Sequence, residues 1–254
     1  MVCCNLKGGL GNMLFQIASA YAISVENNDT LIIDEKKSHK VHNNIDFYKK
    51  NIFRKLTYEK CYNENTYNEK YFHYNKINYQ KNILIDGYFQ SEKYFSNHKK
   101  DILNLFSIDE NSNLYINNKY GSILNDETCS IHIRRGDYLN LPNYHPICEK
   151  EYYIKAIDKF KSNTKFLIFS DDINWCKNNL IGNNFIFIEN EFDYIDIWLM
   201  SLCKNNIIAN STFSWWGAWL NKNENKKIIS PKKWFGPLIN HNTKDLIPNT
   251  WITI

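Results

Sequence analysis

Two adjacent arginines follow an apolar run in the second half of the chain. The run at residues 130–133 is typical of a buried strand, and Arg134, Arg135, Gly136 and Asp137 come directly after it. Open α/β sheets bind their ligands at the carboxyl ends of strands. One guanidinium could grip a pyrophosphate through two parallel hydrogen bonds, while the other pairs with a neighbouring carboxylate. An exposed Arg-Gly-Asp turn stays open as the alternative, but the pattern favours a phosphate-bearing ligand.

Two acidic residues, Asp171 and Asp172, follow a second apolar run at residues 165–169. Paired carboxylates could bind a divalent metal or accept hydrogen bonds from a nucleotide. Aspartate is also a favoured N-cap, so the same pair could begin a helix without contacting any ligand. The sequence leaves these interpretations open. No group of His and Cys residues has the spacing of a zinc site.

Two further loops place small or hydroxyl residues before an amphipathic helix. The first contains Gly9, Gly11 and Asn12, and the second contains Ser211 and Thr212. Free N–H groups at a helix N-terminus suit phosphate oxygens, and glycine lets a backbone approach a ligand closely. The glycine spacing matches neither the dinucleotide fingerprint nor the P-loop, so a plain strand-to-helix turn stays open for the first loop.

The elements that must position these loops alternate between strand and helix. Apolar runs predict strands at residues 2–6, 31–33, 83–85, 130–133, 165–169, 185–188, 206–209 and 227–230. Helical spacing predicts helices at residues 14–25, 94–106, 152–160, 195–202 and 213–220. Such alternation predicts an α/β fold with parallel sheets covered by helices. We expect the three tryptophans between residues 213 and 220 to lie mainly in the core.

The regular pattern breaks twice. Residues 36–80 are too rich in Tyr, Asn and Lys for elements to be placed. Residues 107–128 look irregular, and we expect the boundary between two domains there. The predicted domains are residues 1–118 and residues 119–254.

Composition excludes several classes of protein. The 254 residues are 43% hydrophobic and 23% charged, which is ordinary for a globular chain. The net charge of +4 is spread along the sequence, whereas a nucleic-acid binder usually concentrates basic residues into a stripe. No apolar run approaches the ~20 residues of a membrane helix, and no signal-peptide pattern is visible. Seven cysteines without a CxxC pair favour buried thiols in a reducing compartment. We therefore expect a cytoplasmic protein.

Three motifs together resemble the α-1,2-fucosyltransferases of glycosyltransferase family 11. They are GGLGNMLFQIASAYAIS, HIRRGDY and NSTFSWWGAWL, in this order. The resemblance covers residues 1–25 and 129–231 and is slight over residues 36–80. It implies a GT-B fold, in which two Rossmann-like units face each other across a cleft. The N-terminal unit would lie on the acceptor side and the C-terminal unit would bind the donor.

The resemblance also implies a reaction. L-Fucose would pass from GDP-β-L-fucose to the 2-hydroxyl of a β-galactosyl acceptor, with inversion and without a cofactor or an essential metal. The acceptor would be an oligosaccharide or a glycolipid, so peripheral association with the inner membrane face stays open. The arginines would hold the donor pyrophosphate. Carried over by position, the donor-binding residues are Gly9, Gly11, Asn12, Arg134, Arg135, Asp171, Ser211, Thr212 and Phe213.

The base that removes the acceptor proton is the least certain part of this assignment. Asp137 is the first candidate because it neighbours the arginines. A carboxylate clamped by arginine is a poor base, however, so a structural role for Asp137 stays open. His132 is the second candidate, although its ring could instead pack or orient Arg134.

The sequence departs from the family pattern in three respects. Met13 stands where many members have Gln, the chain is short, and the membrane anchor of the animal members is not seen. A short chain suggests trimmed acceptor loops. Two alternatives therefore remain: a transferase for another GDP-sugar or linkage, and a non-catalytic glycan-binding relative.

Overall fold

The computed structural model describes residues 1–34, 40–41 and 43–254. The chain forms two compact units. Unit 1 comprises Met1–Asp109 and His241–Pro248, and unit 2 comprises Glu110–Asn240 and Asn249–Ile254. The division between the units lies after Asp109, within the region 107–128 where a boundary was expected, and the chain returns to unit 1 near its end. The predicted domains, residues 1–118 and 119–254, were two continuous segments.

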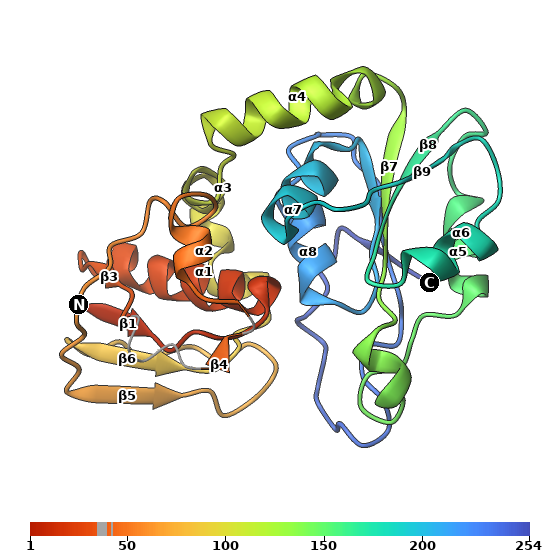
Figure 1. Ribbon diagram of the computed structural model, residues 1–254. Helices are drawn as coiled ribbons and strands as arrows, with labels where there is room; N and C mark the ends of the chain where they lie inside the picture. Colours follow the sequence, from red (N-terminus) through yellow and green to blue (C-terminus); the bar gives the residue numbers. More distant parts are fainter. Residues whose placement is uncertain (35–39, 42) are drawn as a thin grey trace. The chain divides into compact units, whose positions relative to one another are not determined.

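Unit 1 is built on a parallel sheet with the strand order β3-β1-β6-β5. These strands are β1 (Val2–Cys4), β3 (Leu31–Ile32), β5 (Asn65–Asn68) and β6 (Ile83–Asp86), and a short pair joins β2 (Lys7–Gly8) to β4 (Lys40–Val41). The helices are α1 (Leu10–Glu26), α2 (Asp46–Lys49) and α3 (Lys99–Leu105), with 3-10 turns η2 (Glu92–Tyr94) and η3 (Ser96–His98). Helix α1 packs on β1 and β3 (Figure 1). The carboxyl end of β1 therefore leads directly into the glycine loop before α1.

Unit 2 contains a longer parallel sheet with the order β12-β11-β10-β7-β8-β9. Its strands are β7 (Thr128–Ile133), β8 (Lys165–Ser170), β9 (Phe185–Phe187), β10 (Asn205–Ile207), β11 (Ile228–Ser230) and β12 (Ile252–Thr253). Its helices are α4 (Glu110–Leu124), α5 (Lys150–Ile157), α6 (Ile173–Asn179), α7 (Asp193–Leu202) and α8 (Thr212–Trp219), with the 3-10 turn η4 (Asp137–Asn140). In Figure 1, α7 and α8 lie on one face of this sheet and α5 and α6 on the other.

Burial explains why these segments form the core of unit 2. All six residues of β7 are buried, as a strand covered by helices on both faces requires. Trp215, Trp216 and Trp219 are at most 3% exposed and pack against one another, which confirms that the tryptophans belong to the core. Helix α8, which carries them, packs on β10.

Helix α4 is a feature that the sequence pattern did not predict. Residues 107–128 were expected to be irregular, yet Glu110–Leu124 forms a helix. Only Ser112, Ile116 and Tyr120 of this helix are buried, one in each turn, and Ser112 is polar. Such a narrow and partly polar stripe gives almost no hydrophobic periodicity.

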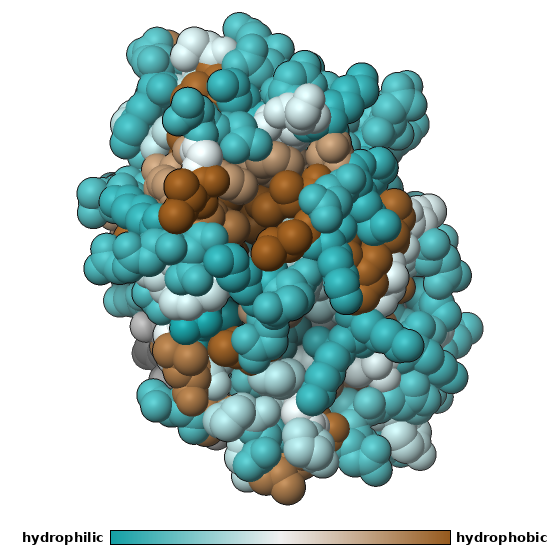
Figure 2. Space-filling model, turned by 90° about the vertical axis from the view of Figure 1, so that its right-hand side faces the viewer, coloured by the Kyte–Doolittle hydropathy of each residue, from teal (hydrophilic) through white to brown (hydrophobic). Residues whose placement is uncertain are grey.

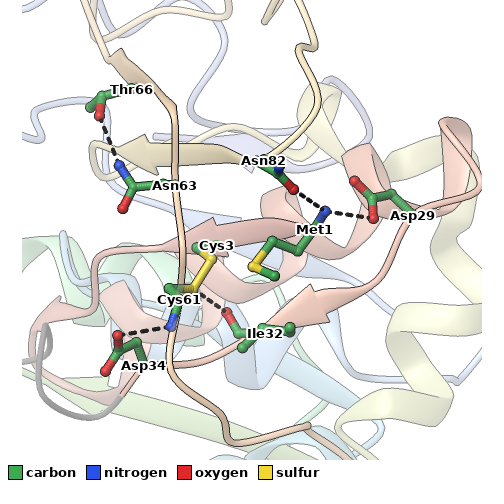
Figure 3. Close-up of a disulfide and its surroundings, with 9 residues drawn as sticks. All are labelled: Met1, Cys3, Asp29, Ile32, Asp34, Cys61, Asn63, Thr66 and Asn82. Atoms are coloured by element: carbon green, nitrogen blue, oxygen red, sulfur yellow. Dashed lines mark hydrogen bonds and ion pairs between the residues drawn. A yellow bond between two sulfur atoms is a disulfide. The ribbon is translucent and has the colours of Figure 1, made fainter.

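A disulfide between Cys3 and Cys61 corrects the expectation that all cysteines are thiols (Figure 3). It joins β1 to a segment 58 residues later, and both half-cystines are buried. The backbone N–H of Cys61 donates to Asp34 at 2.9 Å, which holds this segment beside β3. A pairing over such a distance leaves no trace in local spacing. The other five cysteines are buried thiols, but the cysteine content no longer supports a reducing compartment.

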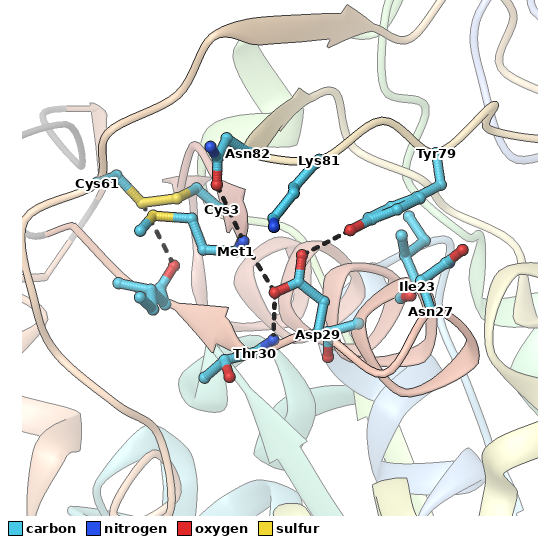
Figure 4. Close-up of polar contacts among 12 residues, drawn as sticks. Met1, Cys3, Ile23, Asn27, Asp29, Thr30, Cys61, Tyr79, Lys81 and Asn82 are labelled. Atoms are coloured by element: carbon cyan, nitrogen blue, oxygen red, sulfur yellow. Dashed lines mark hydrogen bonds and ion pairs between the residues drawn. A yellow bond between two sulfur atoms is a disulfide. The ribbon is translucent and has the colours of Figure 1, made fainter.

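Asp29 organises the turn between α1 and β3 in unit 1 (Figure 4). Its carboxylate accepts hydrogen bonds from the backbone N–H of Thr30 and the hydroxyl of Tyr79, each at 2.8 Å, and lies 2.8 Å from the α-amino group of Met1. Burial alone would raise the pKa of Asp29, but these partners together lower it. The carboxylate thus ties the first strand to the chain that precedes β6.

The surface of unit 2 is mainly hydrophilic on the side that carries α5 and α6, with a hydrophobic patch among the polar groups (Figure 2). Exposed apolar side chains of this unit include Ile154 on α5 and Ile181 after α6. Within the described residues, no helix is both long enough and apolar enough to span a membrane.

Candidate active site

The carboxyl ends of three adjacent strands, β10, β7 and β8, bring the polar loops of unit 2 together. Strand β7 ends at Ile133, directly before Arg134, and β8 ends at Ser170, directly before Asp171. The loop after β10 leads to Ser211 and α8. Because all three strands run parallel, the loops share one edge of the sheet, as predicted from the sequence.

Arg134 is held between two carboxylates. Its Nη2 donates to Asp137 Oδ1 at 2.6 Å, and its Nη1 lies 3.0 Å from Asp171 Oδ2. The guanidinium also lies over the ring of Tyr138, 5.4 Å from its centroid. Gly136 is needed here, because a Cβ at this position would lie 2.5 Å from Asp171 Oδ2. The glycine therefore allows the loop to approach Asp171 rather than a ligand.

Arg135 is held differently, by one carboxylate and one aromatic ring. Its Nε donates to Asp172 Oδ2 at 3.0 Å, and its guanidinium lies 4.1 Å from the centroid of the Trp175 ring. The side chain is only 12% exposed. Among the residues that the structure describes, no hydrogen-bond partner faces its two terminal amino groups. Arg135 therefore presents an oriented pair of donors, which suits two oxygens of a phosphate.

The two aspartates after β8 bond the arginine loop, and one of them also caps the next helix. Asp171 Oδ1 accepts from the backbone N–H of Arg135 at 2.9 Å. Asp172 caps α6 by accepting from the backbone N–H of Trp175 at 3.2 Å, while its other oxygen holds Arg135. The capping interpretation is thus right for Asp172. Within the described residues, no three His, Cys, Asp or Glu side chains form a group that could hold a metal ion.

The loop before α8 is fixed by Asn210, a residue that sequence reasoning did not single out. Its Nδ2 donates to the carbonyls of Pro146 and Trp234, at 2.8 and 3.0 Å, and its own carbonyl accepts from the hydroxyl of Tyr138 at 3.2 Å. Ser211 then caps α8 by accepting from the backbone N–H of Phe213. Asn210 is 1% exposed, so its role is to join three loops at the sheet edge.

Phe213 and His132 lie together beneath these loops. Their ring centroids are 5.3 Å apart, and His132 is 5% exposed. Burial and the nearby Arg134 lower the pKa of His132 to about 3. A buried imidazole of such low basicity cannot readily take a proton from an acceptor hydroxyl. Its burial therefore argues against His132 as the base, and its Nδ1 has no hydrogen-bond partner among the described residues.

A second group of candidate residues lies in unit 1, where β1 leads into α1. Gln16 is fully buried and bonds both the N–H and the carbonyl of Lys7, at 3.0 and 3.1 Å. The Lys7 ammonium pairs at 2.7 Å with Asp86, the last residue of β6. Gly9 stands at the N-cap of α1 in an extended conformation, and Gly11 is buried in the first turn. These contacts fix the loop that carries Asn12.

Asn12 faces this loop from the first turn of α1. Its Oδ1 accepts from Gln90 Nε2 at 3.0 Å, and a Cβ on Gly8 would lie 2.5 Å from its Nδ2. The φ of Gly8 is 81°, which a side chain would also disfavour. Met13, the departure from the family pattern, is fully buried in the core. Sequence reasoning found the glycines and Asn12 but missed Gln16 and Gln90, since a single Gln in an apolar run has no characteristic spacing.

Comparisons with known proteins agree with this arrangement. The model of the family described as Glycosyl transferase family 11 matches residues 1–254. An α-1,2-colitosyltransferase of Escherichia coli is 35% identical, over 100% of this chain and 99% of the relative. The O-antigen biosynthesis glycosyltransferase WbnK of Escherichia coli is 32% identical, over 98% of this chain and 99% of the relative.

The fold has a solved counterpart as well. The crystal structure of NodZ α-1,6-fucosyltransferase soaked with GDP-fucose superposes with a TM-score of 0.58 at 12% identity, covering 86% of this chain and 92% of NodZ. This likeness confirms the predicted α/β class of GT-B type. From the match of the family model over residues 1–254, and from two relatives that are 32% and 35% identical over nearly their whole length, it follows that this chain is an enzyme, a glycosyltransferase belonging to glycosyltransferase family 11.

Proposed function

We propose that the protein transfers L-fucose from GDP-β-L-fucose to the 2-hydroxyl of a β-galactosyl acceptor, with inversion at the anomeric carbon. The observation that carries the proposal is the pair of terminal amino groups on Arg135, which have no hydrogen-bond partner among the described residues and are oriented by Asp172 and Trp175 at the carboxyl edge of the unit 2 sheet. A diphosphate is the part of the donor that such a fork fits. The acceptor is an oligosaccharide or the sugar part of a glycolipid.

The departing GDP gains negative charge as the bond to the sugar breaks. Arg135 donates to that charge, and the N-terminus of α8 places the positive end of its helix dipole on the neighbouring loop, where Ser211 and Thr212 are proposed to line the phosphates. Arg134 is paired with both Asp137 and Asp171, so its main role is to hold the loop in place. These cationic groups take the place of a metal, and the proposed reaction is metal-independent.

The acceptor hydroxyl must lose a proton as it attacks. Asp137 is the only candidate for the base that the sequence singled out and that the structure leaves accessible, with 54% of its side chain exposed. One of its carboxylate oxygens accepts from Arg134 at 2.6 Å. We therefore assign Asp137 to the support of Arg134, with proton transfer to solvent or phosphate late in the reaction. The glycine loop of unit 1, with Gly9, Gly11 and Asn12, is proposed to contact the sugars.

A second donor is favoured by one finding. The 35% identical relative is named as an α-1,2-colitosyltransferase, and colitose is the 3-deoxy analogue of L-fucose. The diphosphate, the anomeric carbon and the 2-hydroxyl acceptor chemistry would be the same for both sugars. GDP-colitose is thus the alternative donor, and only contacts to the sugar 3-hydroxyl would separate the two.

A GDP-release assay tests the proposal. The purified protein is mixed with GDP-fucose, GDP-colitose or GDP-mannose, with and without lactose, and the product linkage is read by NMR. We expect release of GDP with one of the first two donors, only with acceptor present, and an α-1,2 linkage. Turnover should survive EDTA. Absence of release with every donor would overturn the proposal, and loss of turnover in EDTA that manganese restores would overturn metal independence.

A further inference from the structure

The carboxyl ends of three adjacent strands in unit 1 bring together one exposed aromatic ring and three charged side chains. Strands β1, β6 and β5 run parallel and lie side by side. Asp86 is the last residue of β6, and Glu69 directly follows β5. Lys7 comes shortly after β1, and Tyr88 comes two residues after β6 ends. Open α/β sheets bind their ligands at this edge.

Tyr88 is the exposed residue of a loop whose neighbouring residues are buried. Gly87 and Phe89 are buried, whereas Tyr88 is 39% exposed. The Lys7 ammonium lies over the Tyr88 ring, 5.0 Å from its centroid, and pairs with Asp86 at 2.7 Å. Within the described parts of the chain, no aromatic ring packs on Tyr88 and no group bonds its hydroxyl. The ring is thus held by an ammonium group and stays partly open to solvent.

The backbone that carries this ring is held in a strained conformation. The Glu69 carboxylate accepts from the backbone N–H groups of Tyr88 and Phe89, at 2.6 and 2.9 Å. Phe89, a bulky and fully buried residue, has a φ of 51°. A Cβ on Gly87 would lie 2.3 Å from the Cβ of Glu69, so only glycine fits there. Such strain is costly and gathers at ligand-binding sites, and packing does not explain why this loop exposes an aromatic ring.

The charges around Tyr88 suit a neutral ligand rather than a phosphate. Lys7 is paired with Asp86, and Glu69 adds a second carboxylate. At the corresponding edge of unit 2, by contrast, Arg135 presents two terminal amino groups. The excess of acidic groups beside Tyr88 would repel a diphosphate but not an uncharged sugar. This edge of unit 1 therefore fits the acceptor of the proposed reaction better than its donor.

We propose that the ring of Tyr88 is the platform on which the terminal β-galactosyl residue of the acceptor stacks. In a β-galactoside the C3–H, C4–H and C5–H groups lie together on one face and form an apolar patch. Their weakly positive hydrogens are attracted to the negative face of an aromatic ring. Lys7 and Asp86 border the ring and would meet hydroxyl groups at the edge of the sugar. The inference rests on the proposed function, in which a β-galactoside is the acceptor.

Tyr88→Ala tests the proposal in transfer assays with lactose, whose terminal residue is a β-galactosyl group. We expect KM for lactose to rise about 5- to 20-fold, the size of one lost aromatic contact. The kcat and the KM for the donor should stay near the wild-type values, because a platform binds the ground state and the transition state equally. Tyr88→Phe keeps the ring and should keep the wild-type KM for lactose. An unchanged KM for lactose in folded Tyr88→Ala, or a rise in the donor KM instead, would overturn the proposal.

Tyr62→Ala is the matched control in the same unit. Tyr62 is 64% exposed, and the Lys60 ammonium lies 4.9 Å from the centroid of its ring. It precedes β5 and so lies toward the amino end of that strand. The control removes the same kind of contact and should leave KM for lactose unchanged, so an equal rise in both variants would overturn the role of Tyr88. Should Tyr88→Ala fail to fold, Tyr88→Leu keeps an apolar side chain without a ring and should still raise this KM.

A binding measurement that needs no turnover separates this inference from the proposed function. Methyl β-D-galactoside is mixed with the protein and GDP, and saturation-transfer NMR identifies the sugar hydrogens that lie against the protein. The wild type should transfer most strongly to the C3–H, C4–H and C5–H groups, and Tyr88→Ala should lose most of this signal. Methyl β-D-glucoside, the epimer at C4, should give a weaker signal, and equal transfer to both sugars would overturn the fit to galactose.

The two failures can be told apart. A wild-type protein that releases no GDP with any donor would overturn the proposed function. Galactoside signals that are absent in the wild type, or unchanged in Tyr88→Ala, would overturn the role of Tyr88.

Discussion

The two neighbouring arginines do different work, although the sequence presents them as a pair. Arg134 contacts Asp137 and Asp171 through both terminal nitrogens, whereas within the described part of the chain the guanidinium of Arg135 bonds a carboxylate through Nε only. The second arrangement keeps the guanidinium in place and leaves its outer edge for a ligand. The pyrophosphate role should therefore depend most on Arg135.

Arg135→Lys tests this difference. A lysine keeps the charge but loses the planar fork, the Nε bond to Asp172 and the face-to-face contact with Trp175. We expect kcat to fall about 100- to 1,000-fold, as when one donor to a developing anion is removed, and the melting temperature to change little. The matched control is Arg54→Lys in unit 1, where the guanidinium bonds the carbonyls of Ser107 and Ile108 and only stability should fall. Near-normal turnover in Arg135→Lys would remove the phosphate role.

Asp137→Asn distinguishes two roles of Asp137, a general base and a residue that only positions Arg134. The amide oxygen can still accept from Arg134, which now lies 2.6 Å from Asp137 Oδ1. If Asp137 only supports the arginine, transfer should fall by less than about tenfold and the pH profile should keep its shape, whereas loss of a general base costs about 100- to 10,000-fold. Rates measured between pH 5 and pH 9 distinguish the two. A large loss together with a flattened acidic limb would make Asp137 the base after all.

Among the secondary-structure elements, the sequence predicted most accurately the strands that are buried on both faces of the sheet. The run at residues 130–133 falls within β7, and the loop after it lies at the sheet edge as expected. Helix α4 was missed because only one residue in each turn is buried. Gln90 and Asn210 were missed because their partners come from loops that are distant in sequence. Candidate residues next to strands can be found from local pattern, but the residues that hold them cannot.

The disulfide is an element-scale feature with a direct consequence for stability. It closes a loop across 58 residues between β1 and the segment after β3, which restricts the unfolded chain. Cys61→Ala should lower the free energy of unfolding by about 3–4 kcal/mol. Chemical denaturation with and without dithiothreitol measures the effect. Dithiothreitol should destabilise the wild type to a similar extent and leave Cys61→Ala unchanged, and an equal effect on both proteins would show that the bond is not the cause.

Helix α7 contains a buried carboxyl group, that of Asp196, in surroundings that disfavour its charged form. Asp196 is largely buried, and its Oδ1 has no hydrogen-bond partner among the described residues. Burial, with smaller contributions from Glu191 and Asp193, raises the pKa of Asp196 to about 8. The folded protein therefore binds a proton that the unfolded chain releases above its ordinary pKa of 3.8, and stability falls as the pH rises from about 4 to about 8.

Asp196→Asn should remove this pH-dependent loss. We expect the variant to gain about 1–3 kcal/mol in unfolding free energy at pH 8, because the amide needs no charge in the core, and to gain little at pH 4. Melting temperatures across this range give the comparison. Asp158→Asn, an exposed position after α5, serves as the control and should have no effect. A gain of equal size at both pH values would contradict the assigned cause.

At the scale of the whole molecule, the path of the chain between the two units affects stability more than the net charge does. The charge of +4 is small and dispersed, and the charges that define the site are local pairs. The chain leaves unit 1 after Asp109, returns to it for His241–Pro248, and ends in unit 2 with β12. Neither unit is thus a continuous segment, and a cut at residue 109 would leave unit 1 without its last eight residues. The returning segment should stabilise unit 1 specifically.

Asp245 is the residue through which this effect can be measured. It is 9% exposed, accepts from the backbone N–H of Tyr74 at 3.1 Å, and pairs with Lys93 at 2.6 Å. Asp245→Ala should destabilise unit 1 by about 1–3 kcal/mol, the typical cost of leaving a buried partner unsatisfied. Hydrogen exchange should show loss of protection at the Tyr74 amide and its neighbours, with the amides of β7 unaffected. Lys244→Ala, at an exposed neighbouring position, is the control.

The pH dependence of the same variant completes the test. Burial alone would raise the pKa of Asp245, but Lys93 and the Tyr74 N–H lower it below its ordinary value of 3.8. A carboxylate with a lowered folded pKa contributes stability above its unfolded pKa and loses it as the pH falls through the folded value. The difference between wild type and Asp245→Ala should therefore be full at pH 7 and shrink as the pH falls below 3.8. A difference that stays constant with pH, or loss of protection in both units, would mean that Asp245 acts by packing alone or that the two units unfold as one.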